Sequence, residues 1–236
     1  MAKSGIAQTG CLAIQYDQGV LVACDSQLIS YYRCSNFTQR FFRINETCAL
    51  VSSGDYADLL WTVERLKVRQ LRDDSYADGY QLDAPRLANL LGHVIYEQRM
   101  KPLLSKATYI VFGIDAQTNK PFSAMIRPQC TLVKNEEIFA NGFCIYQTIS
   151  VVRKRAKELR ENVNNGKALT FDQAVELLKE CIKLQIMVDK NYGFRYQMCD
   201  FNIQNGMKVS EDQKIEMDLS IWKHSKQILS SYDAIC

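Results

Sequence analysis

Residues 9–27, TGCLAIQYDQGVLVACDSQ, decide the fold of this chain. Two mostly apolar runs, Cys11–Tyr16 and 20–24, flank a polar break at 17–19 that ends in glycine, where a tight turn needs positive φ. The stretch predicts a β-hairpin. The second run is continuously apolar, which is typical of a strand buried on both faces near the middle of a sheet. Asp25 then places a carboxylate at the end of a core strand, although Asp and Ser also end strands as ordinary turn formers.

The composition is that of an ordinary globular protein. The chain has 236 residues, enough for one large domain or two small ones, with 47% apolar and 23% charged residues. Its net charge of +3, from 29 basic and 26 acidic residues, gives no electrostatic footprint for nucleic acid. The densest basic runs, 67–72 and 153–160, are interleaved with apolar residues at helical spacing, so we interpret them as solvated helix faces.

The cysteines and the N-terminal sequence predict where in the cell the protein resides. Nine cysteines form an odd set without a CxxC motif, and several lie inside strand-like runs where Cys packs as a small hydrophobe. We therefore expect reduced thiols. The N-terminus has no signal-peptide pattern, and no apolar run approaches the roughly 18 residues of a spanning helix. These features predict a soluble protein of the cytoplasm and nucleus, with no membrane partner.

Hydrophobic periodicity and turn signals predict the remaining elements. After an irregular linker at 28–37, the expected strands and helices are a strand pair at 39–44 and 47–52, helices at 55–72 and 83–100, strands at 108–114, 121–127, 131–134 and 138–141, a helix at 142–162, a helix after the capping box at 170–173, a strand at 194–203 returning at 207–209, and a partly helical tail. Strands and helices thus come in segregated blocks, which favours an α+β fold. Two helix pairs covering two antiparallel sheets give a four-layer αββα sandwich.

The chain has no repeat and no linker rich in Pro, Gly or Ser. We therefore expect one domain at 9–216, preceded by a short leader at 1–8 and followed by a C-terminal tail at 217–236.

Metal and nucleotide chemistry have little support in the sequence. Only His93 and His224 are present, without an HExxH motif or a Cys/His cluster at zinc spacing. The chain also lacks a GxSxG elbow and a phosphate-cradling glycine loop. We expect neither a metal nor a cofactor.

A threonine at the start of a first strand, an aspartate closing the second and a cation on the next strand form the arrangement of N-terminal threonine hydrolases. Together with GVLVACDS at 19–26 and SGDYAD at 53–58, this set resembles the β-type subunits of the 20S proteasome, from about residue 9 to 209. The resemblance implies the N-terminal nucleophile hydrolase fold. It also implies a 28-subunit double-ring core of α and β subunits, through whose chamber protein substrates pass.

Within that family the chain is most similar to the seventh β position of the eukaryotic ring, a non-proteolytic subunit. The similarity lies in SGDYAD, in RFFRIN at 40–45 and in the tail around Trp222. Other segments resemble other positions: GID at 113–115 with KPF at 120–122 resembles the third β position, and AVELLKEC at 174–181 the fourth.

The resemblance also assigns site positions. Thr9 falls on the nucleophile position of active subunits, and Asp25 and Asp189 match their two aspartates. Four residues depart from the active pattern, and they are Gln8 in place of a self-cleavage Gly, Arg40 in place of Lys if the linker is one residue shorter, and Phe143 and Tyr192 in place of two Ser. A guanidinium that never deprotonates is a poor substitute for an amine. We therefore expect a degenerate site in which Asp25, Arg40 and Asp189 persist as a buried ion-pair and hydrogen-bond cluster.

The leading hypothesis is a non-catalytic structural β subunit of the 20S core, acting in ubiquitin-dependent and other intracellular protein degradation. One alternative is an active threonine protease subunit with Thr9 as nucleophile after removal of the leader. Another is a stand-alone amidohydrolase of the same fold, which would also need a free N-terminal nucleophile. The tail is expected to bind a neighbouring subunit, or else to fold on its own domain.

Overall fold

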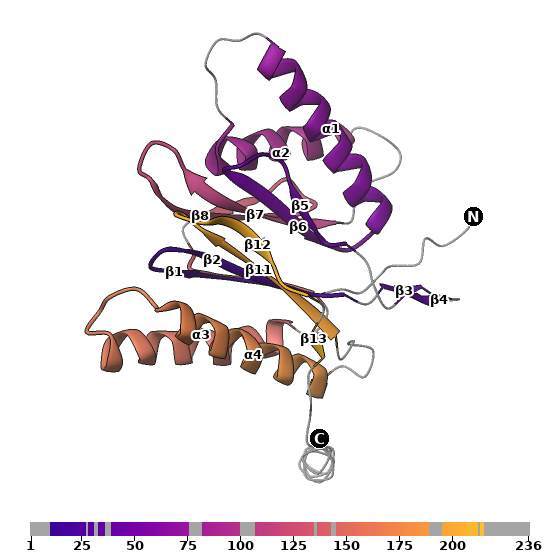
Figure 1. Ribbon diagram of the computed structural model, residues 1–236. Coiled ribbons are helices and arrows are strands. Elements are labelled where there is room, and N and C mark those ends of the chain that lie inside the picture. Colours follow the sequence, from indigo (N-terminus) through magenta and orange to yellow (C-terminus); the bar gives the residue numbers. More distant parts are fainter. Residues whose placement is uncertain are drawn as a thin grey trace.

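The computed structural model describes residues 10–26, 28–30, 33–35, 39–75, 82–99, 107–134, 136–142, 145–188, 195–211 and 213–214. Two antiparallel sheets face each other, and a pair of helices covers the outer face of each sheet (Figure 1). This arrangement confirms the predicted α+β class and the four-layer αββα sandwich.

The first sheet contains the opening hairpin at its centre. Its strand order is β10-β1-β2-β11-β12, and β13 also pairs with β11. The bounds are β1 Cys11–Tyr16, β2 Gly19–Asp25, β10 Ile138–Asn141, β11 Arg195–Asn202, β12 Gly206–Val209 and β13 Gln213–Lys214.

The second sheet has the order β5-β6-β7-β8-β9, and β3 and β4 form a separate pair. The bounds are β3 Leu28–Ser30, β4 Arg33–Ser35, β5 Phe41–Arg43, β6 Cys48–Ser53, β7 Thr108–Asp115, β8 Lys120–Ile126 and β9 Leu132–Lys134.

Helices α1 and α2 lie on the second sheet, and α3 and α4 lie on the first (Figure 1). Their bounds are α1 Tyr56–Ser75, α2 Ala84–Arg99, α3 Ile145–Glu158 and α4 Phe171–Val188, with a π-helix η1 Leu159–Val163 directly after α3. No helix in the described part of the chain is long and apolar enough to span a membrane.

The hairpin supplies side chains to two different cores because successive residues of a strand point to opposite faces. In β2, Val20, Val22 and Cys24 join the core between the two sheets. Leu21 and Ala23 join the core under α3 and α4. Every residue of β2 is buried, which confirms the prediction of a central strand covered on both faces.

The inter-sheet core is organised around aromatic side chains from both sheets. Phe112 of β7 makes edge-on contacts with Phe41 of β5 and Phe201 of β11, at ring-centroid distances of 6.5 and 6.2 Å. These contacts join the two sheets into one body.

Several expectations were wrong in detail. The expected linker at 28–37 contains the strands β3 and β4, and β13 was not predicted. Each strand is so short that it shows no usable alternation, so pairing rather than pattern defines it. The third helix was expected at 142–162. The structure describes α3 over Ile145–Glu158, and the last turn, η1, is a π-helix in which Asn164 N donates to Leu159 O at 3.0 Å.

The helical spacing of Leu59, Leu60, Val63, Leu66 and Leu71 predicts one apolar stripe on the first helix, and this prediction was partly wrong. Leu59, Val63 and Leu66 are buried, whereas Leu60 and Leu71 are 45% and 69% exposed. They lie on the outer face of α1, away from the sheet below it.

The capping box before α4 forms as predicted. Gln173 N donates to Thr170 Oγ1 at 3.4 Å, and Thr170 N donates to Gln173 Oε1 at 3.0 Å. Replacing Thr170 with alanine should therefore lower the free energy of unfolding by about 1 kcal/mol, because it leaves an N-terminal amide without its acceptor. Urea denaturation checks this, with the exposed Lys179→Ala on the same helix as control. Equal midpoints for the two variants would contradict the prediction.

Candidate functional site

The structure describes two of the six positions that the sequence assigns to the degenerate site, Asp25 and Arg40. The other four lie outside the described residues, and they are Thr9, Phe143, Asp189 and Tyr192. The site is therefore built here from the two described positions and their surroundings.

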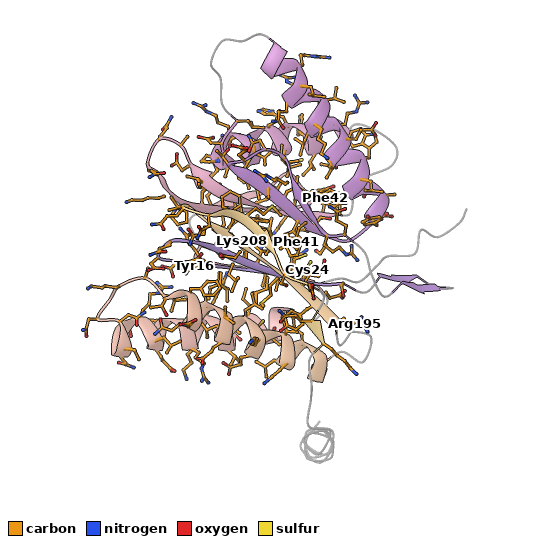
Figure 2. The ribbon with its side chains drawn as sticks, viewed as in Figure 1. Tyr16, Cys24, Phe41, Phe42, Arg195 and Lys208 are labelled. Carbon is orange, nitrogen blue, oxygen red and sulfur yellow. The ribbon has the colours of Figure 1, made fainter. Side chains whose placement is uncertain are left out.

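Asp25 is the last residue of β2 and is fully buried. Its backbone N donates to Gly10 O at 3.2 Å, and the next residue, Ser26, donates its backbone N to Arg195 O at 3.2 Å. The end of β2 is thus held between the start of β1 and the start of β11. Figure 2 shows Cys24 and Arg195 at this end of the first sheet.

Arg40 immediately precedes β5 in the second sheet and is 1% exposed. Its guanidinium carbon lies 5.6 Å from the centroid of the Tyr56 ring, at the start of α1. Within the described part of the chain, none of its three guanidinium nitrogens has a hydrogen-bond partner. A cation in this position is held by the face of an aromatic ring and by packing.

Asp25 and Arg40 belong to one cluster, because the charges of both residues act on the thiols of Cys11 and Cys24. Burial raises the pKa of Cys11 to about 12, while the Arg40 charge lowers it and the Asp25 charge raises it by smaller amounts. Burial likewise raises the pKa of Cys24 well above its usual range, and the same two charges act on it. Asp25 and Arg40 therefore share one buried region between the two sheets. Arg40 makes none of the predicted hydrogen bonds within the described residues, and Asp189, the third predicted member of the cluster, lies outside them.

A polar contact joins the sheets at the same end. Asn141, at the end of β10 and opposite Cys11 in the ladder, donates its side-chain amide to Ser53 Oγ at the end of β6. Gly54 follows with φ of 115°, a conformation that glycine adopts without strain. These residues belong to the SGDYAD segment and to the end of the 138–141 strand.

Sequence reasoning did not single out Cys11, Tyr56 or Asn141 as site residues. The register of the predicted hairpin would have placed Cys11 opposite Cys24. No local pattern identifies Tyr56 or Asn141, because their positions depend on packing between distant segments.

The chemical capacity of the described cluster is limited. Both thiols are protonated at neutral pH because burial disfavours their charged form. Arginine does not release a proton in proteins, so Arg40 cannot serve as a base. Among the described residues, no group of three His, Cys, Asp or Glu side chains is arranged to hold a metal ion.

The four-layer sandwich, with a buried aspartate ending its second strand, is the fold of the N-terminal nucleophile hydrolases. The family model described as proteasome subunit matches residues 7–200 of this chain. The chain therefore belongs to the proteasome subunit family.

Similar curated proteins are β subunits of the proteasome. The chain is 26% identical to proteasome subunit beta type-4 of Drosophila melanogaster, over 89% of this chain and 77% of the relative. It is 23% identical to the probable proteasome subunit beta type-7 of Schizosaccharomyces pombe, over 89% of this chain and 78% of the relative. The beta type-4 subunit of Xenopus laevis is 24% identical, over 86% and 80% of the two chains. These matches place the chain among the β-type subunits.

Proposed function

We propose that this chain is a non-catalytic β subunit of the 20S proteasome, of the kind found at the seventh β position, and that its work is assembly of the core. The observation that carries the proposal is the presence of a buried arginine, Arg40, at a site position. With a linker that is one residue shorter, the resemblance places Arg40 where active members have Lys, and its guanidinium is buried against Tyr56. It provides a permanent charge but no amine that could exchange a proton with a threonine hydroxyl.

The outer surface of α1 supports an assembly role. Leu60, Val68 and Leu71 are 45%, 50% and 69% exposed on this helix. Beside them, Trp61 and Arg65 line a groove of about 410 Å³ between α1 and α2. Clustered apolar exposure of this kind is typical of a surface that another protein covers. A subunit packed among ring neighbours would bury it.

The relatives are named as proteasome subunits beta type-4 and beta type-7, which supports the part of the proposal that makes this chain a β subunit. Protein substrates and the other α and β subunits of the core are the partners that the proposal implies.

The proposal predicts that Thr9→Ala leaves proteolysis unchanged. Core particles carrying the variant should hydrolyse a panel of fluorogenic peptides at the rate of unmodified particles, because Thr9 does not act as a nucleophile. The intact mass of the subunit taken from these particles should show that residues 1–8 are still present. The Thr9 amine is then part of a peptide bond.

Native electrophoresis provides the control, since both particles must contain equal amounts of double rings before rates are compared. A subunit lacking residues 1–8, together with loss of one peptidase activity in the Thr9→Ala particles, would instead identify an active threonine protease. Equal activity with a shortened subunit would still exclude Thr9 as a required nucleophile.

A further inference from the structure

Cys11 and Cys24 face each other directly across the β1–β2 ladder. The neighbouring pair, Gly10 and Asp25, is hydrogen-bonded, because Asp25 N donates to Gly10 O. Hydrogen-bonded and non-hydrogen-bonded pairs alternate along an antiparallel ladder, so Cys11 and Cys24 form a non-hydrogen-bonded pair.

The backbone hydrogen bonds that β1 and β2 make to their other neighbours, β10 and β11, lead to the same conclusion. Gln15 N donates to Glu137 O, so the backbone N–H and C=O groups of the odd-numbered residues of β1, Cys11 among them, face β10. Ser26 N donates to Arg195 O, so the backbone N–H and C=O groups of the even-numbered residues of β2, Cys24 among them, face β11. No backbone hydrogen bond therefore lies between the two cysteines.

This position suits a disulfide. A non-hydrogen-bonded pair brings its Cα atoms to about 4.5 Å, within the range of about 4.4 to 6.8 Å that disulfides span. Both side chains point to the same face of the sheet, since both belong to the core between the sheets. The other buried thiols differ: Cys48 lies opposite Gly113, Cys199 lies opposite Val22, and Cys181 is on α4.

We propose that Cys11 and Cys24 are an oxidation-sensitive pair, which a peroxide converts to a disulfide across the two strands of the hairpin. The thiolate of one cysteine attacks a peroxide oxygen, giving a sulfenic acid and releasing hydroxide, which takes up the thiol proton as water. The second thiol then attacks the sulfenic sulfur, and the sulfenic oxygen leaves as water. Overall, two thiols lose two electrons and two protons to one hydrogen peroxide, which yields two waters.

The burial of the two thiols and the charges near them determine which oxidant can react and how fast the disulfide forms. The two side chains are only 1% and 2% exposed, so a small oxidant such as hydrogen peroxide reaches them more readily than a bulky one such as glutathione disulfide. Burial raises the pKa of both thiols, and the charges of Arg40 and Asp25 shift it by smaller amounts in opposite directions, so the reaction is slow. The preference for this pair comes from the second thiol directly opposite the first. The disulfide would fix the ends of β1 and β2, next to Asp25. The pair is present whether or not Thr9 is catalytic.

The sequence makes the test direct. Cleavage by trypsin after Lys3 and Arg33 gives one peptide, 4–33, which contains Cys11 and Cys24 and no other cysteine. The folded full-length chain is treated with hydrogen peroxide, then unfolded, alkylated with N-ethylmaleimide and digested. We expect the larger share of this peptide to be unalkylated and lighter by two hydrogen atoms, and to accept two alkyl groups after reduction.

Cys48 and Cys181 are the matched controls, since they are also buried but have no cysteine opposite, and they should remain alkylated. The variants Cys24→Ser and Cys24→Ala should abolish the lighter peptide, whereas Cys48→Ser should not. A 4–33 peptide that stays doubly alkylated, or that carries sulfinic acid in place of the disulfide, would overturn the proposal. So would equal oxidation of Cys48 and Cys181.

Discussion

Replacing Gly19 with alanine should destabilise the folded chain by about 3 kcal/mol or more, at the upper end of overpacking effects. A Cβ atom on Gly19 would lie 2.2 Å from the backbone O of Phe201 and 2.6 Å from the Tyr16 hydroxyl oxygen. The carbonyl belongs to the central strand β11 and cannot move without breaking the ladder. Urea denaturation followed by circular dichroism measures the loss.

Gly92 is the matched control for this prediction. It lies inside α2, and a Cβ atom there meets nothing within 4 Å. Gly92→Ala should therefore raise the free energy of unfolding by up to about 1 kcal/mol, because alanine is the better helix former. If both variants shifted stability in the same direction, the close approach at Gly19 would not be the reason for a glycine in the hairpin.

Gly19 also shows where sequence reasoning reached the right residue for the wrong reason. A glycine requiring positive φ was expected there, but Gly19 is not among the glycines of the described chain that have positive φ. The glycine is needed because β11 passes close to it. Contact with a strand more than 180 positions away leaves no local signal, whereas turn propensity does.

The layers of the fold could be predicted because alternation and helical spacing record which faces are buried. Val20, Val22 and Cys24 on one face and Leu21 and Ala23 on the other are read directly from the sequence once the strand is recognised. The same reasoning overestimated the buried face of α1, since Leu60 and Leu71 are apolar without being covered by this chain. Periodicity identifies apolar residues but not the protein that buries them.

The site was predictable in part. The hairpin places Asp25 at a strand end, and its complete burial follows from the apolar strand before it. The contact of Arg40 with the Tyr56 ring could not be predicted, because no local pattern records how the start of α1 packs beside the start of β5.

Asp25→Asn should cost about 3 to 5 kcal/mol of folding stability, the range observed when one charge of a buried pair is removed. Asp25 and Arg40 are 0% and 1% exposed, and they act with opposite sign on the pKa of Cys11. Without the carboxylate charge, the Arg40 guanidinium would be a buried cation whose one cation–π partner among the described residues is the Tyr56 ring. Chemical denaturation of the variant measures the loss, with the exposed Glu64→Gln expected to stay within about 0.5 kcal/mol of the parent.

Arg40→Met should cost less than Asp25→Asn, because methionine fills a similar volume and a carboxylate left alone can be neutralised by a proton, whereas a guanidinium left alone cannot lose its charge. The guanidinium also forms no hydrogen bond within the described residues that the substitution would break. If the two charges compensate each other, the double variant should be more stable than Asp25→Asn alone, since it removes the uncompensated cation. A double-mutant cycle measures this coupling. Additive losses, or a larger loss for Arg40→Met than for Asp25→Asn, would show that the two residues do not form a compensating pair and that Arg40 is retained for its packing.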